Sequence, residues 1–244
     1  MDPITQQTVL AAAGAGGDSL YVDDVFSPTL YFGNGGTLPI NNGIDLAGEG
    51  GLVWIKLREA EYRHYLYDTE RGARKYVQSD ENSAEQTHTY GLTSFNNNGF
   101  TLGQEGQNNA NGGSFVAWTF RKAPGFFDVV TWTGNGTAGR TIPHNLGSVP
   151  GMIFVKCTSN NENWAVWHRN LSSGSFMMLN VTNSETSNSG YFTTTVPTDT
   201  VFSLGNADEV NGNTRTYVAY IFAHDDASFG TGGDESIIKC GSYN

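Results

Sequence analysis

The residues best suited to chemistry in this chain are carboxylates on a glycine-rich segment. The segment HDDASFGTGGDE at 224–235 brings together Asp225, Asp226, Asp234 and Glu235. Closely spaced oxygen ligands among glycines suit a hard cation such as Ca²⁺. The spacing is not that of an EF-hand loop, so the sequence favours a solvated loop and leaves a calcium site at these four acids as the alternative. No cofactor is expected.

Other acid pairs could serve glycoside hydrolysis, which places two carboxyl groups on either side of the scissile bond. The candidates are Asp45 with Glu49, and Asp68 with Glu70. Neither pair recurs in the duplicated sequence described below, and acids on glycine-rich loops are usually solvated. We therefore predict no catalytic residues and no enzymatic activity.

Motifs of other catalytic and metal-binding classes are missing from the sequence. It contains neither Gly-x-Ser-x-Gly nor His-Glu-x-x-His. The histidines are scattered, at His64, His88, His144, His168 and His224. We interpret His144 as bracing a turn through hydrogen bonds. Cys157 and Cys240 lack Cys-x-x-Cys spacing, which favours two buried free thiols over a zinc site or a disulfide.

The charge of the chain argues against nucleic acid as a partner. Thirteen basic and 24 acidic residues give a net charge of −11. The nearest basic cluster, RGARK at 71–75, has Asp68, Glu70 and Asp80 as neighbours, and we interpret it as a solvated loop. No apolar run approaches the ~20 residues that cross a bilayer. The first residues also lack the pattern of a secretion signal, so neither membrane insertion nor export by that route is expected.

Aromatic residues could stack on sugars. Tyr65 and Tyr67 in HYLYD correspond to Trp164 and Trp167 in ENWAVWHR. If these residues alternate along strands, each pair lies on one face, which predicts a structural role in the core. A glycan site at the loop tips is the alternative, without a defined position.

The elements that position these residues occur twice in the chain. GLVWIK at 51–56 returns as GMIFVK at 151–156, FTLG at 100–103 as FSLG at 202–205, and SFVAWTF at 114–120 as TYVAYIF at 216–222. The turns FGNGG at 32–36 and TGNGT at 133–137 also correspond, and so, by the same reading, do Asn111-Gly112 and Asn211-Gly212. Several landmarks in nearly constant register indicate an internal duplication.

Short runs of β-branched and aromatic residues between Asn-Gly turns predict strands and hairpins after residue 20. We therefore predict an all-β fold of two tandem β-sandwich/jelly-roll-like repeats, 21–125 and 126–244, behind a short N-terminal arm at 1–20. The repeats are expected to pack together, with Trp54 and Phe154 in equivalent buried positions.

Both ends of the sequence suggest docking. A short helix-forming segment within 1–17 is marginal alone in water, so it is either a frayed terminus or an arm that orders on a neighbour. SIIKCGSY at 236–243 occupies the place of FFDVVTW at 126–132 and is expected to form a strand, in the preceding unit or with another subunit. Because unpaired apolar strands invite association, a homo-oligomer is expected, with a trimer favoured.

The sequence also resembles a repeat domain of virion structural proteins of marine bacteriophages, often described as tail-fibre-like. The resemblance is carried by YVDDVFSPTLYFGNGG (21–36), NNGIDLAGEGGLVWIK (41–56), FVAWTFRKAPGFFDVVTWTGNG (115–136), HNLGSVPGMIFVKCTS (144–159) and IIKCGSY (237–243). The strand-and-turn pattern is similar to concanavalin and laminin-G sandwiches as well.

The resemblance implies a non-enzymatic virion protein, assembled in the host bacterial cytoplasm and in contact with other virion proteins. It implies a position in the tail or on the head surface. The alternative is a tail module that binds a glycan receptor on the host.

Overall fold

The computed structural model describes residues 19–241. The chain is nearly all β, with 39% strand and 4% helix, so the predicted all-β sandwich fold is confirmed. The predicted arm lies outside the described residues apart from Ser19 and Leu20. None of the helices within 19–241 has the length and apolar character that crossing a bilayer requires.

The first unit contains a six-stranded sheet, a three-stranded sheet and two single-turn helices. Its elements are α2 (Val22–Val25), β1 (Phe26–Phe32), β2 (Leu38–Asn41), β3 (Gly51–Leu57), β4 (Tyr65–Asp68), β5 (Lys75–Gln78), β6 (Gln86–Thr87), β7 (Leu92–Asn96), β8 (Gly99–Leu102), α3 (Gly106–Asn109) and β9 (Ser114–Arg121).

The second unit contains a six-stranded and a two-stranded sheet. Its strands are β10 (Phe127–Thr133), β11 (Arg140–Pro143), β12 (Met152–Cys157), β13 (Ala165–His168), β14 (Ser175–Met178), β15 (Thr186–Ser187), β16 (Val201–Leu204) and β17 (Thr216–Phe222).

The two large sheets have the same antiparallel topology. The first has the order β1-β9-β3-β4-β5-β6 and the second β10-β17-β12-β13-β14-β15. The register is also the same, because Trp54 pairs with Leu66 and Phe154 pairs with Val166 at matching rungs. Trp54 and Phe154 are thus equivalent, but only Phe154 is buried, whereas Trp54 is half-buried.

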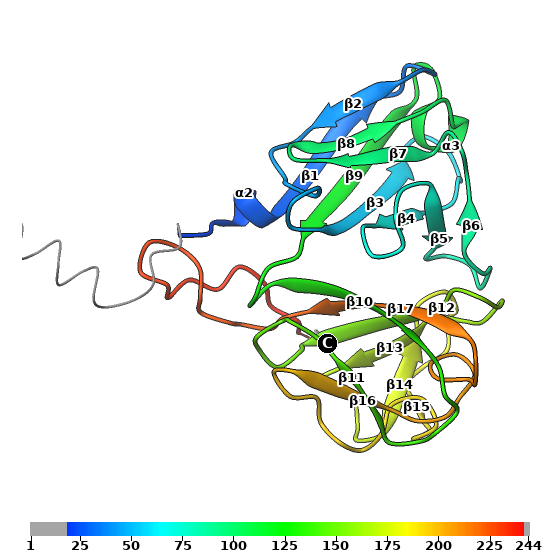
Figure 1. Cartoon of the computed structure of the whole chain (residues 1–244), viewed down its shortest axis with the longest axis vertical. Helices are drawn as coiled ribbons and strands as arrows, with labels where there is room; N and C mark the ends of the chain where they lie inside the picture. The colour runs from blue at the N-terminus through cyan, green and yellow to red at the C-terminus, as the bar shows by residue number, and fades with distance from the viewer. Residues whose placement is uncertain (1–18, 242–244) are drawn as a thin grey trace, which may run out of the picture.

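The sheets form a stack of layers. The large sheets face each other at the middle of the molecule, and the small sheets β2-β8-β7 and β11-β16 lie on the outer sides (Figure 1). Each unit has its own core between its large and small sheets. A further apolar cluster joins residues of both units between the two large sheets, which confirms that the repeats pack together.

The strand β3 explains why this arrangement follows from the sequence. Val53 and Ile55 point into the core of the first unit, while Leu52 and Trp54 point toward the junction with the second. A strand that is covered on both faces reads as an unbroken apolar run, which accounts for LVWI in one copy and MIFV in the other.

The copies differ at two places in the second unit. Where the first unit forms β7, residues 193–200 form a loop, and only Phe192 retains a bridge to Leu204. The segment 224–235 is inserted after β17. Both differences lie at the same end of the second sandwich, as the pocket described below demonstrates.

The prediction that 236–243 completes a sheet of the preceding unit is wrong for the part that the structure describes, while strand pairing with another subunit stays a prediction. Residues 236–241 form no strand. Instead the carbonyl oxygen of Ile238 accepts from the amide of Asp225 at 2.8 Å, and the amide of Cys240 donates to His224 Nδ1 at 3.0 Å. The segment therefore docks on its own unit. Cys157 and Cys240 are both free and buried, as predicted.

Candidate functional site

The junction between the units is held by hydrogen bonds as well as apolar contacts. The indole of Trp164 donates to the carbonyl oxygen of Gln78 at 2.8 Å, and the amide of Glu85 donates to Thr158 at 2.9 Å. Buried polar groups that are paired in this way hold two surfaces in one register. The two repeats are therefore joined by polar as well as apolar contacts.

A charged cluster is buried at this junction. Arg71 Nε lies 2.5 Å from Asp68 Oδ2, and their side chains are 4% and 0% exposed. Tyr220 of the second unit donates its phenol proton to Asp68 at 2.8 Å and accepts from Arg71 at 3.2 Å. Burial raises the pKa of the Tyr220 phenol well above its ordinary value, so it stays protonated as the donor.

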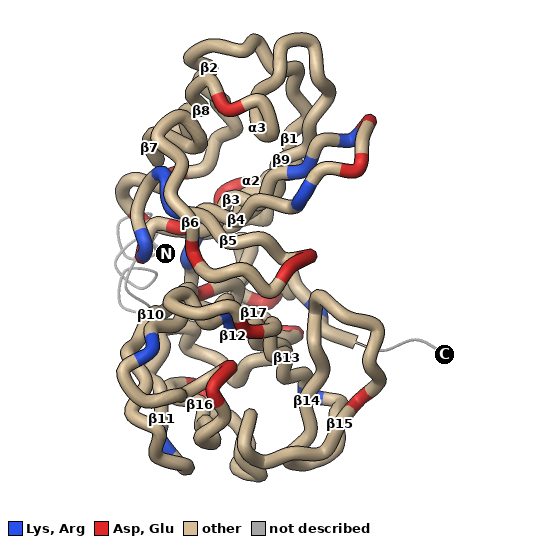
Figure 2. The backbone as a smooth tube through the Cα atoms, turned by 90° about the vertical axis from the view of Figure 1, so that its right-hand side faces the viewer, with Lys and Arg blue, Asp and Glu red and all other residues tan. Residues whose placement is uncertain are grey.

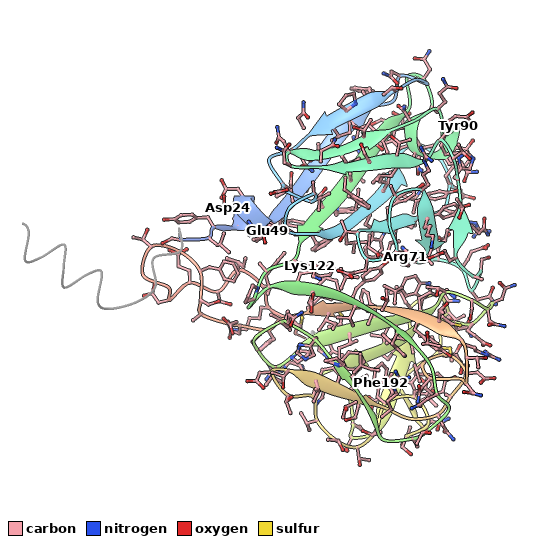
Figure 3. The ribbon with its side chains drawn as sticks, in the orientation of Figure 1. Asp24, Glu49, Arg71, Tyr90, Lys122 and Phe192 are labelled. Atoms are coloured by element: carbon pink, nitrogen blue, oxygen red, sulfur yellow. The ribbon has the colours of Figure 1, made fainter. Side chains whose placement is uncertain are left out.

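This cluster corrects the interpretation of RGARK as a solvated loop. Arg71, labelled in Figure 3, lies at the junction. Its side chain is buried and paired with Asp68, so it is not accessible to a phosphate group. Lys75 is exposed but lies 3.5 Å from Glu85. In Figure 2 the remaining basic residues are scattered over both units.

A lysine at the equivalent position of each copy holds the loop that follows its strand. Lys56 donates to the carbonyl oxygens of Leu57 and Ala60. Lys156 donates to those of Cys157 and Glu162, and also reaches Asn82 of the first unit at 3.2 Å. Lys156 is fully buried, and this burial lowers the pKa of its ammonium to about 8.

A buried asparagine organises the turns of each copy. The Asn109 side-chain amide donates to Asn34, Gly36 and Gly103, and the Asn211 amide donates to the matching Asn135, Thr137 and Gly205. Asn211 therefore corresponds to Asn109. The predicted equivalence of Asn111-Gly112 with Asn211-Gly212 is wrong by two residues, because Gly112 (φ 78°) matches Thr214 (φ 65°).

The first unit exposes an apolar surface that we call the β1 face. It consists of Leu30 and Phe32, which are 63% and 72% exposed, with the half-buried Val116, Trp118 and Trp54 on the neighbouring strands. The matching positions of the second unit behave differently. Thr131 and Thr133 replace Leu30 and Phe32, and the counterparts of the other three are buried at the junction: Val218, Tyr220 and Phe154.

The second unit contains a cavity of about 600 Å³. It lies among the loop 148–150, the end of β13, the turn 171–174, the loop 193–196 and residues 224–226. The loop 193–196 stands where β7 covers the first unit, and 224–226 begin the insertion. The cavity therefore arises from the two places where the copies differ. We call it the second-unit pocket.

The walls of the second-unit pocket carry an indole, a cation and hydroxyls. Trp167 is half-buried and packs against the unit's core with its inner part. Arg169 is exposed, and its guanidinium makes no hydrogen bond or ion pair with any residue in 19–241. The Ser148 hydroxyl, also in the wall, is buried without a hydrogen-bond partner among those residues.

The four acids proposed as calcium ligands are not gathered into a site. Asp225 and Asp226 line the second-unit pocket, whereas Asp234 and Glu235 do not. Asp225 lies 2.8 Å from Lys239, and the hydrogen bond from this ammonium lowers the pKa of its carboxyl. Within the described part of the chain, no three His, Cys, Asp or Glu side chains are placed to share a metal ion.

The acids considered for hydrolysis are each engaged by other residues. Asp45 accepts from the amide of Gly48 at 2.8 Å, while Glu49 lies 3.6 Å from Arg121. Glu70 pairs with Lys122 at 2.7 Å. Glu49 and Lys122 are labelled in Figure 3 at the edge of the junction.

The two aromatic pairs differ in whether their members share one face of the sheet. Tyr65 and Tyr67 both pack in the first unit's core, as predicted. Trp164 and Trp167 do not share a face, because Trp164 faces the junction and Trp167 the core of its own unit. Their spacing of three residues is odd, which places them on opposite faces of an extended chain. The structure also places His144 as predicted, with Nδ1 accepting from the amide of Leu146.

One family of proteins matches the chain. Its sequence model covers residues 22–233 and is described as a domain of unknown function (DUF7483). No curated protein and no solved structure matches. Because the match extends over both units, the pair of repeats is shared by the family as one module.

Proposed function

The chain belongs to the DUF7483 family, whose function is unknown, and from its sequence and surfaces we propose a role for it. The protein is a non-enzymatic structural protein of a bacteriophage virion, in the tail fibre or on the particle surface. It acts by assembly. The resemblance of its repeats to virion proteins supports this proposal, and the β1 face is the structural observation that carries it.

The β1 face supports association with a second copy of the chain. In the second unit the corresponding sheet face is covered by a sandwich of the same fold, so such a sandwich complements this surface. Exposed Leu30 and Phe32 extend that face to the edge strand β1. Contiguous apolar surface of this kind usually marks a protein contact. The homo-oligomer, a trimer if the chain belongs to a fibre, also contacts other virion proteins.

The test uses the residues that the second copy carries. The double variant Leu30→Thr/Phe32→Thr places the counterparts Thr131 and Thr133 on the first unit. Light scattering coupled to gel filtration should give an oligomer for the wild type and a monomer for the variant. The matched control, Val181→Thr, changes an apolar residue that is 38% exposed in the second unit and should remain oligomeric. A wild type that stays monomeric at its highest soluble concentration contradicts self-association through this face.

The position in the particle is tested separately. Antibodies raised against the purified chain should label purified virions of the phage that encodes it, at the tail or on the head surface. Virions that contain none of the chain by mass spectrometry would refute the structural role.

A second candidate function, recognition of a host-surface glycan, is favoured by the second-unit pocket. The pocket is independent of the β1 face, because the two surfaces belong to different units. A glycan array separates the candidates, since a component that acts only by assembly gives no signal.

A further inference from the structure

We propose that the second-unit pocket binds a short acidic saccharide, with a sugar ring against Trp167 and a sugar carboxylate on Arg169. This inference rests on the second candidate function, glycan recognition, and names its site and ligand class. The assembly role does not depend on it.

The pocket is specific to one copy of the duplicated fold. At the position of Trp167 the first unit has Tyr67, whose side chain is fully buried and cannot contact a ligand. At the position of Arg169 it has Thr69, whose hydroxyl accepts from the amide of Gly51 at 2.9 Å. Its β7 completes a small sheet where the second unit has the open loop 193–196. The shared fold therefore does not require this cavity or its lining.

The size and lining of the pocket suit a saccharide. A cavity of about 600 Å³ is within the usual range for small-molecule sites. The face of an indole carries negative charge density and attracts the weakly positive C–H groups of a sugar ring. Ser172, Ser173, Thr194 and Thr195 line the same cavity and can exchange hydrogen bonds with sugar hydroxyls. A purely apolar ligand would leave these groups without partners.

One cation of the pocket, Arg169, offers a partner to an acidic ligand. The Arg169 guanidinium is unpaired within 19–241, although the chain carries a net charge of −11 and most other basic side chains have acidic partners. A guanidinium binds a carboxylate through two parallel hydrogen bonds. Asp225 feels the charge of Arg169, which helps to lower the pKa of its carboxyl, but its ion pair at 2.8 Å is with Lys239.

The remaining pocket acid and histidine are also compatible with this ligand. Asp226 lines the cavity without an ion pair in the described residues and can accept from a sugar hydroxyl. His224 Nδ1 accepts from the amide of Cys240, which leaves Nε2 as the ring nitrogen that can donate. Residues 224–226 of the insertion thus add polar groups to the second-unit pocket, and the first unit has no counterpart of these residues.

The experiment uses the full-length chain on an array of uronate- and sialate-bearing oligosaccharides, each printed beside a neutral analogue with its carboxyl group reduced. We expect binding to acidic glycans only. Titration calorimetry with the best acidic glycan should then give an affinity at least tenfold weaker for Arg169→Gln. The control Arg63→Gln changes an exposed arginine of the first unit and should bind like the wild type. Because Arg169 is exposed, its variant should unfold at the wild-type temperature.

The outcomes separate the inference from the function on which it rests. Equal binding of acidic and neutral glycans, unaffected by Arg169→Gln, overturns the acidic ligand but leaves glycan recognition standing. A silent array overturns both. If acidic glycans bind Arg169→Gln as tightly as they bind the wild type, the ligand is held elsewhere on the protein, and the assignment to this pocket is overturned.

Discussion

Lys156 is fully buried and donates one hydrogen bond across the junction, to Asn82, whereas its counterpart in the first unit, Lys56, is only half-buried. The pKa of Lys156 is about 8, below the ordinary 10.5, so protonation favours the unfolded state between these values. The stability that this residue contributes is therefore lowest below pH 8 and increases as the pH rises toward 10.

We expect this dependence to disappear in Lys156→Met. Compared with that variant, the wild type should gain roughly 2 kcal/mol between about pH 8 and pH 10, in urea unfolding at each pH. Other ionising groups are common to both proteins and cancel. Lys56→Met is the control for losing carbonyl hydrogen bonds away from the junction. Parallel pH profiles for wild type and Lys156→Met would show that the ammonium is not held in a charge-disfavouring site.

The asparagines Asn109 and Asn211 give a second test at the residue scale. Each is fully buried, and its amide satisfies three acceptors in neighbouring turns. Replacing either by Ala removes three hydrogen bonds and the buried donor of two backbone carbonyl groups, and should cost about 2–4 kcal/mol of unfolding free energy. Asn111→Ala, at the exposed position first equated with Asn211, should cost less than about 0.5 kcal/mol. Similar losses for Asn109→Ala and Asn111→Ala would contradict the assignment.

The correct equivalence of these asparagines was available in the sequence. FTLG and SFVAWTF flank the turn, and both return at an offset of 102, which pairs position 109 with 211. The Asn-Gly motif drew attention two residues away because it is the stronger turn signal. What no local pattern supplies is the set of carbonyl groups that the buried amide reaches, since these come from two separate segments, 34–36 and 103 in the first copy and 135–137 and 205 in the second.

Among the elements, the strands that are covered on both faces were the most predictable. LVWI and MIFV are continuous apolar runs, and they form the strands β3 and β12. The segment 236–241 has a similar apolar pattern, but its backbone bonds go to His224 and Asp225 instead of a strand. The sequence TTTVPTDT at 193–200 indicates why the second unit has no counterpart of β7. Pro197 has no backbone N–H with which to donate a hydrogen bond to a neighbouring strand.

This contrast between elements predicts different reactivities for the two buried thiols. Cys157 ends a central strand of a six-stranded sheet, whereas Cys240 lies in a segment without strand pairing. Local opening should therefore expose Cys240 well before global unfolding exposes Cys157. Labelling with a thiol reagent, followed by mass spectrometry, should modify Cys240 at least tenfold faster in dilute urea. Cys157→Ser and Cys240→Ser identify the labelled site, and equal rates would mean that the terminal segment opens only with the whole fold.

For the whole molecule, the duplication predicted two like units in contact. The segment Lys122-Ala123-Pro124-Gly125 lies between the last strand of the first unit and the first strand of the second. The sequence did not reveal that the contact buries Asp68, Arg71 and Tyr220, because two of these residues lie in one copy and the third in the other. The second-unit pocket was equally hidden, since its walls come from five separate segments.

The buried cluster predicts how the whole molecule unfolds. Arg71→Met leaves Asp68 charged and buried at the junction and should cost roughly 3–5 kcal/mol. The double variant Asp68→Asn/Arg71→Met removes both charges and should recover part of that loss. Calorimetry should give one transition for the wild type, because the units share a core. If the single and double variants are equally unstable, the cost comes from packing and not from an unpaired charge.

The two units present the same face of their large sheets to each other, although different positions of the two copies make the contact. Joining these halves of the molecule through Lys122-Ala123-Pro124-Gly125 turns a bimolecular encounter into an intramolecular one, with an effective concentration on the order of millimolar or above. Dilution can then no longer separate the halves. Neither half has to preserve a surface for rebinding its twin, so each is free to specialise: one has an apolar edge, and the other has a pocket.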